Sequence, residues 1–240
     1  FDSYSTDKTK ELSITSGATV FERKFDDYAA QRNAAINSIS DEFDWILMID
    51  ADERIDPSLK DEINYLINSS DSASMYLVRR KDFFLNTWLR KSSGYPTWFP
   101  RLFKNGEVQV ERKINEEYLT TGNKAYLENN LIHYPFNNGI ESWLKRHNNY
   151  STMESDVLYT ESFETIPWKY ALSKDPTLKR KFQKRLIYSL PCRPIIIFII
   201  FYFIRGGFLD GKAGYIFCKL RYIYEIMIDA KLDEIKANKQ

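Results

Sequence analysis

Apolar residues in the first third of the chain follow two spacings, which predict alternating helices and strands. Residues 44–50 read Asp-Trp-Ile-Leu-Met-Ile-Asp, a near-continuous apolar run typical of a strand buried on both faces of a sheet. Residues 75–79 form a second β-rich run, and residues 7–16 and 28–39 have helical composition. Asp56-Pro57 supplies a capping side chain and a first-turn proline for another helix. This alternation predicts an α/β fold with a mostly parallel sheet.

The pattern changes after residue 80. Residues 81–135 contain short apolar runs separated by Trp, Tyr, Pro and Gly, which predict short strands and loops that form one wall of a site. Residues 140–161 return to helical spacing, residues 195–204 are unbroken apolar sequence, and residues 215–232 form an amphipathic pattern. Helices are therefore expected throughout the last part of the chain.

The apolar run at residues 195–204 is too short to cross a bilayer. Ten helical residues extend about 15 Å, half of a hydrocarbon core of about 30 Å. The preceding residues 169–193 contain eight Lys or Arg and one acid, and a basic flank attracts anionic lipid. We expect this region to contact a membrane surface, with a buried core helix as the alternative. Residues 1–165 are then the α/β domain, and residues 166–240 a membrane-associating helical region.

Charge is distributed unevenly around a formal net charge of +1. Residues 1–168 contain 19 Lys or Arg against 27 Asp or Glu, whereas residues 169–240 contain 15 against 6. The acidic first part argues against nucleic-acid binding, which requires a basic surface. Two cysteines, Cys192 and Cys218, form neither a disulfide framework nor a metal knuckle, which favours a reducing compartment. The chain begins at Phe1 without a signal-peptide pattern, so we expect it to be part of a longer protein.

Two acidic turns are candidates for ligand binding. Asp50 and Asp52 follow the strongest predicted strand, at the edge where open α/β sheets bind ligands, and carboxylates two residues apart on extended backbone point the same way. Their oxygens suit Mg²⁺ or Mn²⁺ bridged to phosphate, although a solvated acidic turn is the alternative. Asp2, Ser3 and Asp7 lie in a second turn that suits a nucleotide base and ribose. Helix capping is the other explanation for Asp7.

Four further side chains suit phosphate, sugar or metal. Arg32 lies on a predicted helix, where its guanidinium either meets a phosphate or pairs with a surface acid. Trp98 and Arg101 lie in the irregular middle segment, and an aromatic face and a guanidinium suit a sugar and a phosphate on the acceptor side. His133 is a candidate metal ligand, with a structural histidine as the alternative.

Taken together, the motifs resemble family 2 glycosyltransferases, most closely the branch of lipopolysaccharide core β-1,4-glucosyltransferases. Each motif is short, but their order and spacing cover nearly the whole chain. The matching residues are Asp2-Ser3-Tyr4-Ser5-Thr6-Asp7, Ala30-Gln31-Arg32-Asn33, Asp50-Ala51-Asp52-Glu53-Arg54, Arg101-Leu102-Phe103, Ile114-Asn115-Glu116, His133-Tyr134 and Gly206-Gly207-Phe208-Leu209-Asp210-Gly211.

The resemblance implies a GT-A type nucleotide-binding fold and an inverting transfer from a nucleotide diphosphate sugar, with UDP as the expected nucleotide. It implies that Asp2 contacts the base and that Asp50 and Asp52 hold the ribose-diphosphate and a divalent metal, to which His133 is a candidate third ligand or else a phosphate contact. Glu116 matches the position of the general base, which takes the proton of the acceptor hydroxyl. The acceptor is expected to be a lipid-linked or lipopolysaccharide-core saccharide at the cytoplasmic face of the bacterial inner membrane.

The chain departs from the family pattern at two places. Asn115 stands where the family usually has His, which removes a titratable neighbour of Glu116. Family members also begin with a strand and a helix that precede this sequence, so we expect the chain by itself to bind nucleotide weakly.

Two other functions fit the same residues. One is a metal-dependent phosphotransfer or nucleotide-sugar enzyme that shares the paired aspartates, and product analysis distinguishes it. The other is a non-catalytic, membrane-bound interaction protein of the same fold. Binding of metal and UDP-sugar distinguishes that alternative.

Overall fold

A computed structural model of the protein describes residues 1–39, 41–69, 73–111, 116–161, 167–173, 179, 182, 186–188, 190 and 192–239. The chain forms two compact units. The first comprises Phe1–Arg79 and Trp98–Leu131, and the second comprises Arg80–Thr97 and Ile132–Gln240. The domain boundary predicted at residue 165 lies outside the described residues and stays a prediction.

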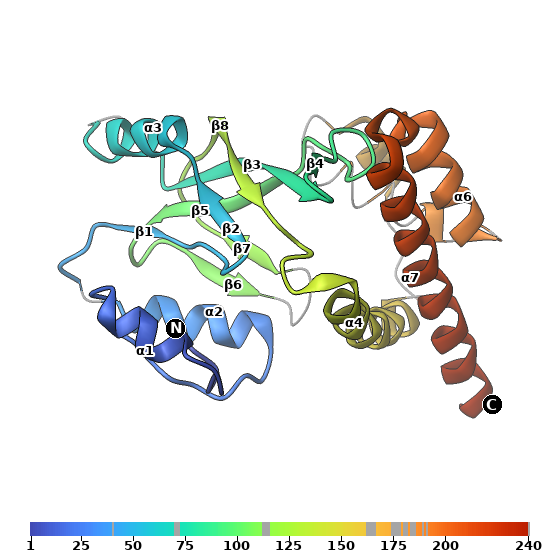
Figure 1. The fold of residues 1–240 in the computed structure, drawn as a ribbon, viewed down its shortest axis with the longest axis horizontal. Helices are drawn as coiled ribbons and strands as arrows, with labels where there is room; N and C mark the ends of the chain where they lie inside the picture. Colours follow the sequence, from blue (N-terminus) through green and yellow to red (C-terminus); the bar gives the residue numbers. More distant parts are fainter. Residues whose placement is uncertain are drawn as a thin grey trace. The chain divides into compact units, whose positions relative to one another are not determined.

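The first unit contains three helices and most of the strands that the structure describes (Figure 1). Two of its strands, β3 and β8, continue into the second unit. Its elements are α1 (Thr9–Thr15), α2 (Tyr28–Asn37), β1 (Trp45–Leu47), β2 (Glu53–Ile55), α3 (Pro57–Ile67), β3 (Met75–Phe84), β5 (Trp98–Lys104), β6 (Gln109–Glu111), β7 (Glu117–Leu119) and β8 (Lys124–His133).

Helices cover both faces of the main sheet, whose strand order is β1-β5-β3-β8-β2. Consecutive residues of a strand face opposite sides, and the core follows this alternation. Met75 and Phe103 pack with α2, whereas Tyr76 and Leu102 pack with α3. Figure 1 shows α2 and α3 on opposite sides of the strands. The first unit is therefore a three-layer α/β/α sandwich, which confirms the predicted α/β class.

The prediction of a mostly parallel sheet needs a correction, because neighbouring strands of known register run antiparallel. β1 pairs with β5, and β5 pairs with β3, both in antiparallel register. Parallel neighbours need a crossover connection, usually a helix, but residues 85–97 between β3 and β5 contain only the short strand β4 (Thr87–Trp88). The chain turns back instead of crossing over, and the sheet is mixed.

The predicted start of α3 is confirmed by its capping contact. Asp56 Oδ1 accepts a hydrogen bond from Leu59 N at 2.8 Å, and Pro57 is the first residue of α3. A side chain that accepts from an unpaired amide of the first turn stabilises the helix start by about 1 kcal/mol. The cap predicted at Asp7 needs a correction, because the N-cap of α1 is Lys8 and it has no side-chain capping contact. Asp7 Oδ1 instead accepts from Thr9 N at 2.9 Å, in a local turn of three residues.

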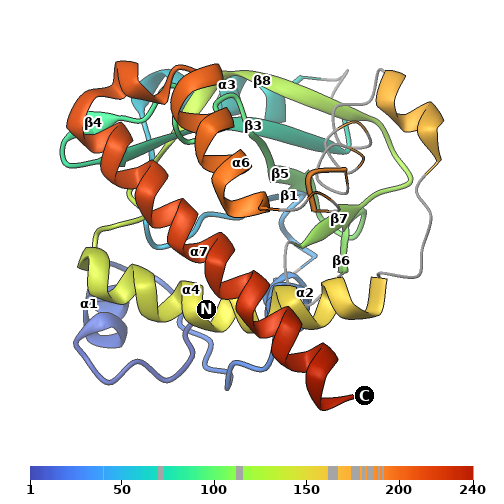
Figure 2. The same cartoon turned by 90° about the vertical axis from the view of Figure 1, so that its right-hand side faces the viewer.

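The second unit is mostly helical. Its largest helices are held together by a cluster that includes Trp143, Ala213 and Leu220, and Figure 2 shows α7 passing along both α4 and α6. About half of the basic stretch 169–193 lies outside the described residues. The elements are β4, α4 (Gly139–Glu161), η1 (Trp168–Leu172), α6 (Arg193–Ile199), the π-helical η2 (Ile200–Ile204), η3 (Gly207–Asp210) and α7 (Gly211–Asn238).

Charged side chains fasten α7 to its neighbours in this unit. Arg193 of α6 is buried and contacts Glu225 Oε2 at 3.3 Å and Asp229 Oδ1 at 2.7 Å. Lys231 Nζ donates to Asn148 O of α4 at 2.6 Å and to Ser151 Oγ at 2.8 Å. These contacts define the lateral position of α7 against α4 and α6, because charge-assisted hydrogen bonds are directional.

The apolar run predicted at residues 195–204 is helical, as α6 and η2. No described helix alone is long and apolar enough to cross a membrane. The pair Arg193–Ile204 and Gly207–Asn238, bent by 69°, meets the length and composition criteria only when both parts are taken together.

Aromatic rings enclose His147 on α4. The ring centroids of Trp143 and His147 are 3.5 Å apart, and Tyr224 of α7 lies at 5.1 Å. His147 Nδ1 donates to Trp143 O at 2.9 Å. Burial lowers the pKa of His147 from 6.5 to about 4, so this imidazole is neutral in the folded protein at neutral pH.

We expect the free energy of unfolding to fall as the pH drops from 7 to 5, by at most about 2 kcal/mol from His147. The unfolded chain takes up a proton near pH 6.5, whereas the folded protein takes it up near pH 4. The unfolded state therefore binds more protons in this window. Urea denaturation at pH 5 and pH 7 measures the difference, and His147→Gln should reduce it. An unchanged pH dependence in that variant would contradict the prediction.

Candidate functional site

A network of charged side chains lies just beyond β1 in the first unit. Asp50 is its centre: Arg32 of α2 contacts Asp50 Oδ1, and Arg101 of β5 places an NH2 group 2.7 Å from Asp50 Oδ2. Each oxygen of this carboxylate is thus paired with a different guanidinium. The side chains of Arg32 and Asp50 are 20% and 29% exposed, so the network is accessible to a ligand.

The base of the network is a buried ion pair between Glu53 and Arg101. The Arg101 guanidinium donates to both Glu53 oxygens, at 2.9 and 2.8 Å, and Asp50 N donates to Glu53 Oε2 at 3.0 Å. A bidentate pair fixes the plane of the guanidinium. The β3/β5 register also shifts next to Arg101, and such bulges re-aim side chains beside functional sites. Glu53 and Arg101 therefore orient Asp50.

Replacing Arg101 with Met should lower the free energy of unfolding by about 3–5 kcal/mol, because it removes the guanidinium that balances the buried charge of Glu53. The Glu53 side chain is fully buried, and the Arg101 side chain is 6% exposed. Urea denaturation with the matched variant Arg54→Met, at an exposed position of β2, measures the effect. A loss no larger than that of Arg54→Met would refute a supporting role for the pair.

Helix α2 connects the network to two other segments through consecutive residues. Gln31 Nε2 donates to Ser3 Oγ at 3.0 Å, and Arg32 contacts Asp50. Asn33 exchanges two hydrogen bonds with the backbone of Val110, at 2.7 and 2.9 Å. Neighbouring side chains on a helix point about 100° apart, so Gln31, Arg32 and Asn33 contact three separate segments of the chain. The Ala-Gln-Arg-Asn motif thereby positions the acidic turn at residues 2–7, which we call the N-terminal acidic turn, and β6 around Asp50.

Glu116, the predicted general base, lies immediately before β7 and belongs to the same network. Its Oε1 atom is 3.5 Å from Arg32 Nε, and its side chain is 23% exposed. Arg32 therefore contacts both Asp50 and Glu116. The other two residues of this motif, Ile114 and Asn115, lie outside the described residues. The structure brings the predicted diphosphate-binding acid and the predicted base to one guanidinium.

The arginines determine the ionisation of Asp50. Burial raises the pKa of Asp50, but the positive charges of Arg101 and Arg32 outweigh burial and hold the pKa below its ordinary value of 3.8, with the nearby charge of Asp52 opposing them. Burial also lowers the pKa of Arg32, yet the charge of Asp50 raises it overall. The carboxylate and the guanidinium are consequently both charged at neutral pH.

Comparison with known proteins identifies relatives along most of the chain, although no protein-family model matches it. Over 209 residues the chain is 25% identical to the lipopolysaccharide core biosynthesis glycosyltransferase LpsC of Rhizobium meliloti (strain 1021), covering 85% of the chain and 68% of that relative. It is 24% identical over 231 residues to an uncharacterized glycosyltransferase of Rickettsia prowazekii (strain Madrid E), covering 90% and 70%. The chain is a relative of bacterial glycosyltransferases.

A shorter match agrees with this relationship. An uncharacterized glycosyltransferase of Rickettsia bellii (strain RML369-C) is 39% identical over 77 residues, which are 32% of the chain and 25% of that relative. The enzyme class expected from the motifs is therefore confirmed, and the charged network lies in a glycosyltransferase.

Internal hydrogen bonds hold the N-terminal acidic turn of this glycosyltransferase. Asp2 accepts from Ser5 N at 2.8 Å and from Ser5 Oγ at 2.5 Å, and these hydrogen bonds hold the pKa of Asp2 below its ordinary value. Ser3 Oγ accepts from Gln31 Nε2, and Asp7 Oδ1 accepts from Thr9 N. The nucleotide-binding roles of Asp2, Ser3 and Asp7 stay predictions.

The two residues expected on the acceptor side lie on β5 in the first unit. The Arg79 guanidinium lies 5.2 Å from the ring centroid of Trp98, and Tyr126 meets the same ring edge to face at 4.8 Å. Arg101 contacts Asp50 and Glu53. The acceptor roles of Trp98 and Arg101 stay predictions.

His133 lies in the second unit of the glycosyltransferase, beside a carboxylate that sequence analysis did not identify. Its Nδ1 atom is 2.6 Å from Asp82 Oδ1, and Arg80 Nε donates to the same oxygen at 3.0 Å. Burial raises the pKa of Asp82, but the hydrogen bond with His133 and the charge of Arg80 outweigh burial and hold the pKa below its ordinary value. Contact with a buried carboxylate orients His133, whose role as a metal ligand stays a prediction.

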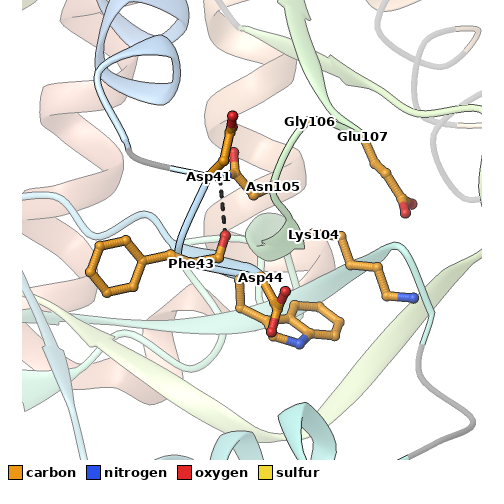
Figure 3. Close-up of a pocket in the computed structure, with 8 residues that line it drawn as sticks. Asp41, Phe43, Asp44, Lys104, Asn105, Gly106 and Glu107 are labelled. Atoms are coloured by element: carbon orange, nitrogen blue, oxygen red, sulfur yellow. Dashed lines mark hydrogen bonds between the residues drawn. The ribbon is translucent and has the colours of Figure 1, made fainter.

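A separate hollow of about 450 Å³ lies at the other end of β1, before Trp45. Figure 3 shows Asp41, Phe43 and Asp44 on one side, and Asn105 Nδ2 donating to Phe43 O at 3.0 Å. None of the predicted site residues lines it. The candidate site is therefore the charged network around Asp50.

Proposed function

We propose that the protein transfers a sugar from a nucleotide diphosphate donor, with UDP as the expected nucleotide, to a lipid-linked or lipopolysaccharide-core saccharide, with inversion at the anomeric carbon. The reaction takes place at the cytoplasmic face of the bacterial inner membrane. The supporting observation is that Arg32 joins Asp50 and Glu116 in one accessible network, in a chain related to glycosyltransferases. The name of the Rhizobium relative, which refers to lipopolysaccharide core biosynthesis, supports the acceptor class.

The donor binds along the surface formed by the N-terminal acidic turn and Asp50. Gln31 and Arg32 are adjacent on α2, and they contact Ser3 and Asp50 respectively. A nucleotide whose base lies near Asp2 and Ser3 would have its diphosphate near Arg32. The partly exposed guanidinium of Arg32 suits phosphate oxygens, because charge-assisted hydrogen bonds to phosphate are strong and directional.

A divalent metal fits the carboxylates at this site. Asp50 already has both oxygens paired with arginines, so Asp52, whose charge acts on Asp50, is the residue that would hold the ion. Mg²⁺ is often bound by one or two carboxylates together with substrate phosphates and water. Among the described residues no group of three or more His, Cys, Asp or Glu is placed to hold a metal ion, so substrate phosphates and water would have to supply most of its ligands. When bound, the metal would neutralise charge on the leaving diphosphate.

Glu116 acts as the general base. Its carboxylate is partly exposed and is held by Arg32 at 3.5 Å, so it is oriented beside the expected diphosphate position. The acceptor hydroxyl gives its proton to Glu116 as its oxygen attacks the anomeric carbon, and the nucleoside diphosphate leaves from the opposite face. Positioned proton transfer of this kind accelerates reactions by about 10²–10⁴-fold.

Product analysis of the protein with UDP-sugars, Mg²⁺ and membrane extract tests the proposal. We expect release of nucleoside diphosphate that depends on the acceptor, together with a glycosylated lipid or lipopolysaccharide product. Transfer of a phosphoryl group would support the phosphotransfer alternative. Absence of both UDP-sugar binding and metal binding would support the non-catalytic alternative.

A further inference from the structure

The helical segments α6, η2 and η3 expose several large apolar side chains. Ile195, Ile199 and Phe203 recur every fourth residue, a spacing that aligns side chains along one side of a helix. Ile204 at the end of η2 and Leu209 in η3 are the most exposed apolar residues of these segments, at 74% and 67%. We call this set the apolar tip: Ile195, Ile199, Phe203, Ile204, Phe208 and Leu209, all between 43% and 74% exposed.

Close backbone contacts hold the apolar tip in its exposed position. A Cβ atom on Gly214 of α7 would lie 2.2 Å from Gly207 O, and a Cβ atom on Gly207 would lie 2.6 Å from Phe201 O. Only glycine permits this approach, and Gly206 adopts a left-handed conformation with φ 75° at the turn. These segments are thus packed directly on α7. Their apolar side chains are therefore presented outward by a preformed turn.

The charges around the apolar tip are positive. Between residues 194 and 224 the sequence contains four cations and one acid. The acid, Asp210, is buried and accepts hydrogen bonds from Lys91 N at 2.9 Å and Ser92 N at 2.7 Å. Arg205, Lys212 and Lys219 are exposed. The accessible charge on this part of the unit therefore complements an anionic surface.

Tyrosines flank the tip, as they do at membrane interfaces. The Tyr202 ring packs against Phe203 at 5.0 Å, Phe208 at 6.3 Å and Tyr215 at 5.6 Å. Tyrosine combines an apolar ring with a polar hydroxyl, and it is enriched where hydrocarbon meets headgroups. Aromatic rings and arginine are also enriched at protein interfaces, so binding of a second copy of the chain is the competing outcome of the experiments below.

We propose that the apolar tip inserts into the headgroup boundary of an anionic lipid membrane, with Arg205, Lys212 and Lys219 contacting lipid phosphates. A helix with an apolar face and a basic surround binds in this way without spanning the bilayer. The inference deepens the proposed function and rests on it in one respect: a lipid-linked acceptor is presented at such a surface. The tip would keep the enzyme at the plane in which its acceptor lies.

Vesicle sedimentation of the full chain, without donor or acceptor, tests this inference independently of glycosyl transfer. We expect binding to phosphatidylcholine vesicles that contain phosphatidylglycerol, and at least tenfold weaker binding for Phe203→Ser/Ile204→Ser/Leu209→Ser. Lys212→Gln/Lys219→Gln should weaken binding to the anionic vesicles alone. The matched control, Leu12→Ser/Ile14→Ser/Tyr65→Ser, removes equally exposed apolar side chains from the first unit and should bind like the original protein.

An inserted reporter tests the same contact without removing apolar surface. In Ile204→Trp the indole emission should shift to the blue on vesicle addition and be quenched by brominated acyl chains. Unchanged vesicle binding in the triple apolar variant, or an Ile204→Trp emission that vesicles do not alter, would overturn the proposal. A concentration-dependent dimer that the triple variant abolishes would also overturn it, since the tip would then bind a second copy of the chain.

Discussion

Replacing Asp52 with Ala is expected to lower kcat/KM for sugar transfer by roughly 10³-fold while leaving the fold intact. Asp52 is the carboxylate beside Asp50 that would hold the metal, and charge neutralisation by a metal contributes several kcal/mol to the transition state. Steady-state release of nucleoside diphosphate measures the loss. Urea denaturation of the same variant should show a change below about 1 kcal/mol, because the buried pair of Glu53 and Arg101 remains.

Asp61→Ala is the matched control for this prediction, because Asp61 is an exposed acid on α3 of the same unit. It should retain full transfer. Turnover by Asp52→Ala that equals turnover by Asp61→Ala would refute the metal-binding role of Asp52.

Glu116→Gln is expected to lower kcat by about 10²–10⁴-fold, because the amide cannot accept the proton of the acceptor hydroxyl. UDP binding should change little, since glutamine has nearly the same shape and Arg32 retains its contact with Asp50. Single-turnover transfer and calorimetric titration with UDP separate the two effects.

Glu117 provides the control, because it is the adjacent exposed acid at the start of β7. Glu117→Gln should transfer sugar at the original rate. If Glu116→Gln kept more than a tenth of that rate, the base would have to be another group.

The local features of the fold are predictable from sequence. Asp56-Pro57 marks the start of α3 because the cap and the first-turn proline act within four residues. The apolar run 44–50 indicates a buried strand for a similar reason, although β1 is assigned only over Trp45–Leu47. The direction of neighbouring strands was predicted wrongly, since pairing of β1 with β5 joins residues more than fifty positions apart and leaves no local signal.

The candidate site was predictable in its residues but not in its connections. Arg32, Asp50 and Glu116 were identified from their motifs, and the structure brings them into one network. Glu53 lies in the same motif as Asp50 and Asp52, but an acid next to two aspartates resembles a solvated turn and indicates no role. Its burial under Asp50 depends on Arg101, which comes from a distant strand. Asp82 gave no signal for the same reason, since its contact with His133 spans 51 positions.

The most direct test of the central claim is a crystal structure of the protein with UDP and Mg²⁺. We expect the diphosphate within hydrogen-bonding distance of Arg32 and the ion bound to Asp52. The Glu116 carboxylate should face the space beside the β-phosphate that the donor sugar would occupy. A nucleotide bound away from Asp50 and Asp52, with no metal at either carboxylate, would contradict the central claim.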